Sequence, residues 1–244
     1  MRLKLLGWLG FVFLLFLLLV PSSLTAAGSN YVILIPGLLR SPKTMEPMAK
    51  ALRAEGYETL IVDYPSREMG IRALADGFVA PAVRRCQKKG AGEILFVTHS
   101  MGGILVRDFL SRHKLPELGR VVMLAPPNGG SEVVDQLGDW EAFKWINGPA
   151  GGELGTGQKS KPKVLGALGV VTYSVGIIAG DRSINPINSM MIPGSDDGKV
   201  SVENTKLAGM TDHITLHRTH PMMMQRADAI QLTLHFLKLG TFAP

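Results

Sequence analysis

The chain has 244 residues, of which 46% are hydrophobic, and a formal net charge of +6 at neutral pH. This length and apolar content suit one globular domain with a full hydrophobic core. Basic and acidic residues are mixed and form no basic stripe with interleaved aromatic side chains, which argues against a nucleic acid as partner. The single cysteine, Cys86, excludes an internal disulfide and any cysteine-based zinc cluster.

The first 27 residues have the pattern of an export signal. Arg2 and Lys4 form a positive start, residues 5–20 are apolar, and Thr25-Ala26-Ala27 supplies the small residues that a signal peptidase recognises. We expect cleavage after Ala27, which would export a domain of residues 28–244 to the periplasm or the medium. The alternative is an uncleaved N-terminal anchor that holds the domain at a membrane, for which about sixteen apolar residues are short.

In the N-terminal half of the domain, short apolar runs alternate with helical patterns. Taken in chain order, the patterns predict a strand over 31–35, a helix over 42–55, a strand over 58–62, a helix over about 68–89, a strand over 94–97 and a helix over 104–113. Gly56 and Gly90 follow the first two helices, where glycine commonly ends a helix.

The second half continues with strands over 120–124, 173–178 and 214–216 and a closing helix over about 221–239. Near-continuous apolar strands separated by helices predict an α/β fold with a mostly parallel central sheet, flanked by helices on both faces.

A lid-like insertion over about 128–171 interrupts this alternation. It has no clear strand and frequent glycines, and it carries an apolar cluster of Trp140, Phe143, Trp145 and Ile146. Long irregular insertions in compact domains are usually functional or mobile. The cluster either meets acyl chains as a lid or covers the core, and the sequence favours neither role.

The stretch EILFVTHSMGGILVRDFL places Ser100 between an apolar strand and a helix, with no loop between them. This is the pattern of a nucleophile elbow, in which a sharp turn lifts a serine above the edge of a sheet. Gly102 provides room two residues after the serine, although Thr98 stands where the pattern prefers glycine. The alternative is an ordinary serine at a helix N-cap.

A serine nucleophile needs a base, and the chain has six histidines. His220 is the predicted base because it lies after the last strand and just before Pro221, a residue suited to the first turn of a helix. His217 is the alternative, whereas His213 lies at the wrong end of the strand. Of the remaining three, His99 is predicted to be structural, His113 to be solvated at a helix end, and His235 to pack within the last helix.

The predicted acid is Asp197, in the segment PGSDDGKVSVENT, because the order Ser, Asp, His is expected for this topology. Asp196 and Asp181 are the alternatives, and an Asp-Gly pair is also a common turn by itself. The predicted oxyanion donors are the backbone N–H groups of Met101, directly after the nucleophile, and Leu38, in the loop after the first strand.

Together these motifs resemble the α/β-hydrolase superfamily, in particular small bacterial lipases and esterases. VTHSMGG is similar to their elbow, and IPGLLRS to their oxyanion segment, with Pro36 in place of the usual histidine. APPNGGSEVVDQLG resembles the turn after the fourth strand, SDDGKVSVENT the acid-bearing turn, and THPMMM the base loop. The resemblance favours Asp197 over Asp181. It implies the α/β-hydrolase fold and a serine hydrolase that cleaves carboxylic esters through an acyl-enzyme, with no metal or cofactor.

The expected partner is a small-molecule ester or lipid. Met222, Met223 and Met224 follow the predicted base and suit the lining of an adaptable apolar pocket, although part of such a run must pack in the core. With the aromatic cluster they favour an acyl ester over a peptide. An acyltransferase with the same three residues is one alternative. A non-catalytic, membrane-anchored domain that binds lipids or a partner is the other. The sequence predicts no oligomeric state.

Overall fold

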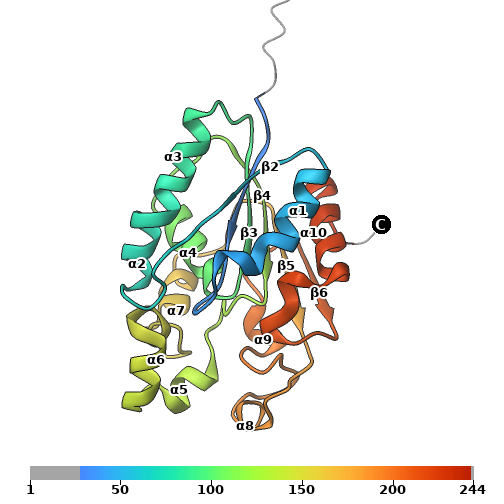
Figure 1. The fold of residues 1–244 in the computed structure, drawn as a ribbon. Coiled ribbons are helices and arrows are strands. Elements are labelled where there is room, and N and C mark those ends of the chain that lie inside the picture. Colours follow the sequence, from blue (N-terminus) through green and yellow to red (C-terminus); the bar gives the residue numbers. More distant parts are fainter. Residues whose placement is uncertain (1–27, 243–244) are drawn as a thin grey trace, which may run out of the picture.

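The computed structural model describes residues 28–242, so the predicted leader, residues 1–27, lies outside the described residues. One six-stranded sheet has the order β2-β1-β3-β4-β5-β6, and every neighbouring pair is parallel (Figure 1). The predicted parallel α/β architecture is therefore confirmed. The strands are β1 (Tyr31–Ile35), β2 (Glu58–Ile61), β3 (Ile94–His99), β4 (Leu118–Leu124), β5 (Val175–Gly180) and β6 (Asp212–Leu216).

Helices cover both faces of the sheet (Figure 1). On one face lie α1 (Glu46–Ala54) and α10 (Ala227–Leu239), and on the other lie α2 (Ile71–Leu74), α3 (Ala80–Lys88) and α4 (Met101–Leu110). Beyond one end of the sheet, Figure 1 shows α5 (Glu132–Leu137), α6 (Glu141–Gly152) and α8 (Pro186–Ser189). The remaining helices are α7 (Lys161–Gly166) and α9 (Val202–Thr205). Within residues 28–242, no helix combines the length and the apolar character needed to cross a bilayer.

Successive side chains of a strand enter opposite cores. Val32 and Leu34 of β1 pack in the core with α1 and α10, whereas Ile33 and Ile35 pack in the core with α2, α3 and α4. All four side chains are fully buried. A strand covered on both faces needs apolar residues at every position, which is why the strands appear as unbroken apolar runs.

Several element boundaries differ from the sequence predictions. Helix α4 begins at Met101 rather than Ile104, so Gly102 and Gly103 are helical. A Cβ on Gly102 would lie 2.5 Å from the carbonyl oxygen of Ile35, so the close approach of β1 requires this glycine despite its low helix propensity. The predicted closing helix is also divided, because Arg226 has extended dihedral angles (φ −83°, ψ 136°) between a 3-10 helix and α10.

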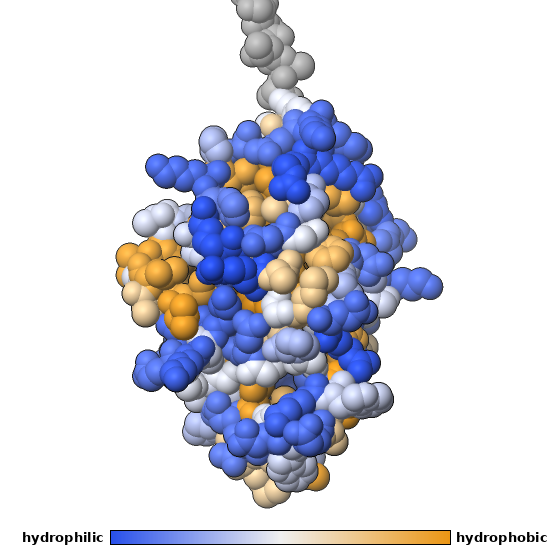
Figure 2. Space-filling model, turned by 90° about the vertical axis from the view of Figure 1, so that its left-hand side faces the viewer, coloured by the Kyte–Doolittle hydropathy of each residue, from blue (hydrophilic) through white to orange (hydrophobic). Residues whose placement is uncertain are grey.

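The insertion is helical rather than irregular, so that part of the prediction is wrong. It contains α5, α6 and α7 and no strand. One of its glycines is required by a close approach of backbone: Gly148 has a φ of 64°, and a Cβ there would lie 2.0 Å from the carbonyl oxygen of Arg67. Exposed apolar side chains lie on and after α7, namely Val164, Leu168 and Val170. Figure 2 shows a hydrophobic patch among hydrophilic residues on the side of the molecule that carries this helix.

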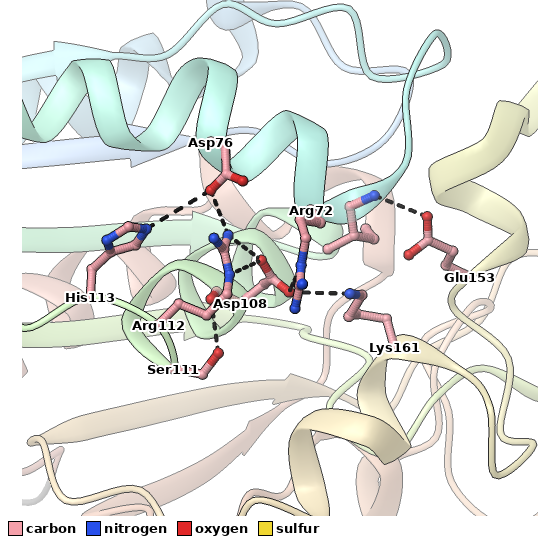
Figure 3. Close-up of polar contacts among 9 residues, drawn as sticks. Arg72, Asp76, Asp108, Ser111, Arg112, His113, Glu153 and Lys161 are labelled. Atoms are coloured by element: carbon pink, nitrogen blue, oxygen red, sulfur yellow. Dashed lines mark hydrogen bonds and ion pairs between the residues drawn. The ribbon is translucent and has the colours of Figure 1, made fainter.

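A buried carboxylate ties the insertion to the core (Figure 3). Asp108 on α4, with a side chain 1% exposed, accepts hydrogen bonds from Arg112 at 2.7 Å and from Lys161 of α7 at 3.2 Å. Glu153, just after α6, accepts a 3.1 Å hydrogen bond from the N–H of Ile71 at the start of α2. Glu153 and Lys161 lie at the two ends of the segment between α6 and α7. Their contacts with α2 and α4 therefore attach both ends of this segment to helices of the core.

Candidate functional site

Ser100 lies at the sharp turn between β3 and α4, with φ 52° and ψ −125°. Positive φ is costly for a residue with a side chain and persists where the surrounding structure imposes it. Among the described residues, only Leu39 and Ala125 share this feature without being glycine. These two follow β1 and β4, so backbone strain gathers at the carboxyl edge of the sheet, around Ser100.

The turn at Ser100 has the geometry that the elbow prediction requires. A Cβ on Gly37 would lie 3.0 Å from the Cβ of Ser100, so the loop after β1 can approach the serine this closely only because residue 37 is a glycine. Thr98 takes the position where the motif prefers glycine. Its side chain is fully buried, and within residues 28–242 its Oγ1 has no hydrogen-bond partner. Threonine is therefore accommodated here at the cost of an unsatisfied hydroxyl.

The structure brings the three predicted residues together, although the chain separates them by up to 120 positions. The Oγ of Ser100 lies 3.0 Å from Nε2 of His220, and Nδ1 of His220 lies 2.7 Å from Oδ2 of Asp197. His220 is 7% exposed and Asp197 is 1% exposed. A carboxylate accepts the Nδ1 proton, which leaves Nε2 free to accept the proton of the serine hydroxyl.

The Asp197-Gly198 turn holds the carboxylate in place. Oδ1 of Asp197 accepts hydrogen bonds from the N–H groups of Lys199 at 3.0 Å and Val200 at 2.9 Å. The carbonyl oxygen of Asp197 accepts the N–H of His220 at 3.0 Å. The acid and the base are therefore linked by backbone as well as by side chain, which fixes the imidazole orientation.

The alternative residues are occupied elsewhere. Asp181 and His217 pair with each other at 2.9 Å, and the side chain of His217 is 73% exposed. Asp196 instead braces the acid-bearing turn by accepting the N–H of Gly198 at 2.7 Å. His213 forms a 3.0 Å hydrogen bond with Thr205. None of these groups is bonded to Ser100.

His99 has a role that the sequence analysis did not identify. The residue is 1% exposed, and its Nε2 lies 2.9 Å from the carbonyl oxygen of His220. A carbonyl only accepts, so Nε2 of His99 carries the proton and donates. Burial lowers the pKa of His99 far below its ordinary value, with a further contribution from His220, so the ring is neutral. The signal in the sequence was a histidine at the last position of a buried strand.

We expect His99 to position the loop that carries His220. In His99→Gln, the side-chain amide N–H can replace the Nε2 donor. In His99→Asn, the side chain is too short for its amide to reach the carbonyl oxygen of His220. We predict that kcat for an ester falls by about tenfold in His99→Asn, since small misplacements of a base have effects of this size, and that it recovers in His99→Gln. Steady-state kinetics on both variants would check this, with melting temperatures as the control. Equal losses in kcat for the two variants would argue for a packing role alone.

Two further residues support the predicted oxyanion loop and were also missed. The hydroxyl of Tyr64 donates a 2.6 Å hydrogen bond to the carbonyl oxygen of Pro36, and Oγ of Ser66 accepts the N–H of Leu39 at 3.1 Å. Burial raises the pKa of Tyr64, so its hydroxyl stays protonated. Leu38 lies between these two contacts, and Met101 begins α4 beside Ser100. Both predicted donors are thus on segments held at the serine.

A cleft of about 320 Å³ opens beside Ser100 and His220. The insertion contributes the apolar side chains of Val133, Val134, Phe143 and Leu154 to its wall, and the loops after β1 and Asp197 contribute both apolar and cationic side chains. Its lining residues include Leu38, Arg40, Ser100, Val133, Val134, Phe143, Leu154, Lys199 and His220. Within residues 28–242, no three His, Cys, Asp or Glu side chains gather in a way that would hold a metal ion.

The aromatic cluster of the insertion divides between the cleft and solvent. Phe143 lines the cleft, whereas Trp140 and Trp145 are 64% and 76% exposed. The tryptophans therefore do not cover the core. Of the two roles weighed for the methionines, the structure shows packing: Met223 and Met224 are fully buried in the core beside α1 and α10, and none of the three lines this cleft.

Comparisons with known proteins bear on the fold. No family model and no curated protein matches the sequence. Among solved structures, the mature lipase BlEst2 of Bacillus licheniformis aligns with a TM-score of 0.69 and 19% identity, over 88% of this chain and 93% of that chain. Esterase Pf2001 of Pyrococcus furiosus aligns at 0.60 with 16% identity, over 87% and 84%. The metagenomic carboxyl esterase MGS0156 aligns at 0.62 with 19% identity, over 80% and 65%. The chain has the α/β-hydrolase fold.

Proposed function

We propose that this protein is a serine hydrolase that cleaves carboxylic esters. The observation that carries the proposal is the unbroken chain of contacts from Ser100 through His220 to the buried carboxylate of Asp197, at 3.0 and 2.7 Å. The strained backbone of Ser100 adds support, because an ordinary N-cap or a binding surface has no need of it. The names of the structural relatives, which are lipases and esterases, agree with this function.

In the proposed reaction, Oγ of Ser100 attacks the ester carbonyl carbon while Nε2 of His220 takes the hydroxyl proton. The negative charge that forms on the carbonyl oxygen is stabilised by the N–H groups of Leu38 and Met101. When the tetrahedral intermediate collapses, His220 returns the proton to the leaving alcohol, and the acyl group remains on Ser100. Water, activated by His220, then releases the carboxylic acid and restores the serine.

The substrate of this proposal is a lipid or other acyl ester. Apolar side chains of the insertion, such as Val133, Val134 and Phe143, line the cleft where an acyl chain would lie. The exposed tryptophans of the same insertion suit contact with a lipid surface. Export through the N-terminal 27 residues remains part of the proposal, and the mass of the protein isolated from its host distinguishes a cleaved leader from a retained anchor.

Covalent labelling tests the proposal. A fluorophosphonate probe, which reacts only with activated serines, should label the wild-type protein and fail to label Ser100→Ala. A chain-length series of nitrophenyl esters should be hydrolysed by the unlabelled enzyme and no longer after labelling. Labelling that persists in Ser100→Ala would remove this serine as the nucleophile. Product analysis with added alcohol separates hydrolysis from acyl transfer, since a transferase would form a new ester in preference to the acid.

A further inference from the structure

Arg40 and Lys199 line the cleft beside the proposed nucleophile, and among residues 28–242 no acidic side chain does. Arg40 lies on the loop that follows β1, three residues after Gly37, and its N–H donates to the carbonyl oxygen of Gly37. Lys199 lies two residues after Asp197, and its N–H donates to that carboxylate. Each cation is therefore carried by a loop that the proposed reaction already uses, one by the oxyanion loop and one by the acid-bearing turn.

Within residues 28–242, neither the Arg40 guanidinium nor the Lys199 ammonium forms a hydrogen bond or an ion pair with another side chain. The carboxylate of Asp197, which acts on Lys199 through its charge, is hydrogen-bonded to His220 and to two backbone N–H groups. By contrast, Arg112 and Lys161, which face the core, share the carboxylate of Asp108. The cleft therefore has two cations beside one carboxylate, that of Asp197, and neither cation is paired with it.

The electrostatics of the cleft agree with this description. Desolvation lowers the pKa of Lys199; the Asp197 carboxylate opposes this effect, and the Arg40 guanidinium adds to it. Arg40 also contributes to lowering the pKa of His99. The two cations are thus near enough to repel each other, and a bound anion would relieve that repulsion.

We propose that the alcohol portion of the ester substrate carries an anionic group, a phosphate or a carboxylate, that Arg40 and Lys199 bind. This inference rests on the proposed function. The apolar side chains of Val133, Val134 and Phe143 suit the acyl chain, which leaves the alcohol portion as the part of the ester that would meet the two cations of the same cleft. Guanidinium and ammonium groups are the usual ligands for such anions in proteins. The products are the carboxylic acid and an alcohol that retains its negative charge.

Soluble esters that share one acyl chain provide the test. Butyryl esters of glycerol, of glycerol phosphate, of glyceric acid and of choline would be compared as monomers, by kcat/KM at low ionic strength. We expect the phosphate or the carboxylate ester to exceed the glycerol ester about tenfold and the choline ester to be the poorest. Raising the salt concentration should reduce the preference, because ions screen a partly exposed cleft.

Variants then assign the preference to the two cations. Arg40→Gln and Lys199→Gln should each lower the ratio of anionic to neutral ester turnover, and the double variant should bring it close to one. Lys238→Gln is the control, since Lys238 pairs with Glu55 near the end of α10 and should leave the ratio unchanged. A wild-type ratio near one, or a ratio that survives in the double variant, would overturn the inference.

Vesicles distinguish a lipid headgroup from a soluble anionic ester. If the cleft binds the anion, the preference for the anionic ester appears with monomeric substrates. If the natural substrate is a lipid, phosphatidylglycerol vesicles are also hydrolysed faster than phosphatidylcholine vesicles. A preference seen only with vesicles would reflect attraction to a charged surface and would also overturn the inference. Failure of the proposed function looks different, because Ser100 would then not react with the fluorophosphonate and the neutral glycerol ester would not be cleaved.

Discussion

Replacing Ser100 with alanine is expected to lower kcat/KM for an ester by roughly 10⁴- to 10⁶-fold, the range found when a serine nucleophile is removed from comparable triads. The Oγ of Ser100 is the hydrogen-bond partner of Nε2 of His220, at 3.0 Å. His220→Ala should cause a loss of similar size, and Asp197→Asn a loss of about 10⁴-fold. The three effects should not add, because the residues act as a unit.

The surface pair of Asp181 and His217 offers matched controls for these variants. Both residue types were plausible from the sequence, yet the pair lies on the surface, joined at 2.9 Å. His217→Ala and Asp181→Asn should therefore keep nearly full activity. Hydrolysis of a nitrophenyl ester, followed at saturating and at low substrate, measures all five variants. Full activity in His220→Ala together with loss in His217→Ala would reassign the base and disprove the site described above.

The second large effect is expected on stability. Asp108→Asn should lower the free energy of unfolding by about 3–5 kcal/mol, the usual cost of leaving buried charges without their partner. The substitution keeps the volume of the side chain but removes the charge that Arg112 and Lys161 share. Lys161, 14% exposed, loses its carboxylate, whereas Arg112, 24% exposed, keeps that of Asp76 at 2.6 Å. Urea unfolding followed by tryptophan fluorescence and by circular dichroism measures the change, and coincident curves justify a two-state analysis.

An exposed ion pair serves as the comparison for Asp108. Glu46 and Arg53 pair on α1, with side chains 54% and 45% exposed. Glu46→Gln should change the free energy of unfolding by at most about 1 kcal/mol, because solvent screens such pairs. If Asp108→Asn changes stability no more than Glu46→Gln, the buried carboxylate does not hold the insertion to the core.

The sequence by itself determined the sheet and the position of the nucleophile. The strands are recognisable because both of their faces are covered, so every position from Val32 to Ile35 is apolar. Ser100 is recognisable because a strand passes into a helix without a loop, with the serine at the junction and two glycines directly after Met101. Both features involve residues that are neighbours in the chain, so they can be recognised from the sequence without the folded structure.

Only the tertiary structure decided which histidine and which aspartate meet that serine. His217 and His220 are three residues apart, and the choice between them depends on which one the end of β6 turns toward β3. The supporting groups were hidden for the same reason: the contacts of His99 with His220 and of Tyr64 with Pro36 join segments 121 and 28 residues apart. Hydrogen bonds between distant segments leave no periodic trace in a sequence, so their partners appear only when the chain is folded.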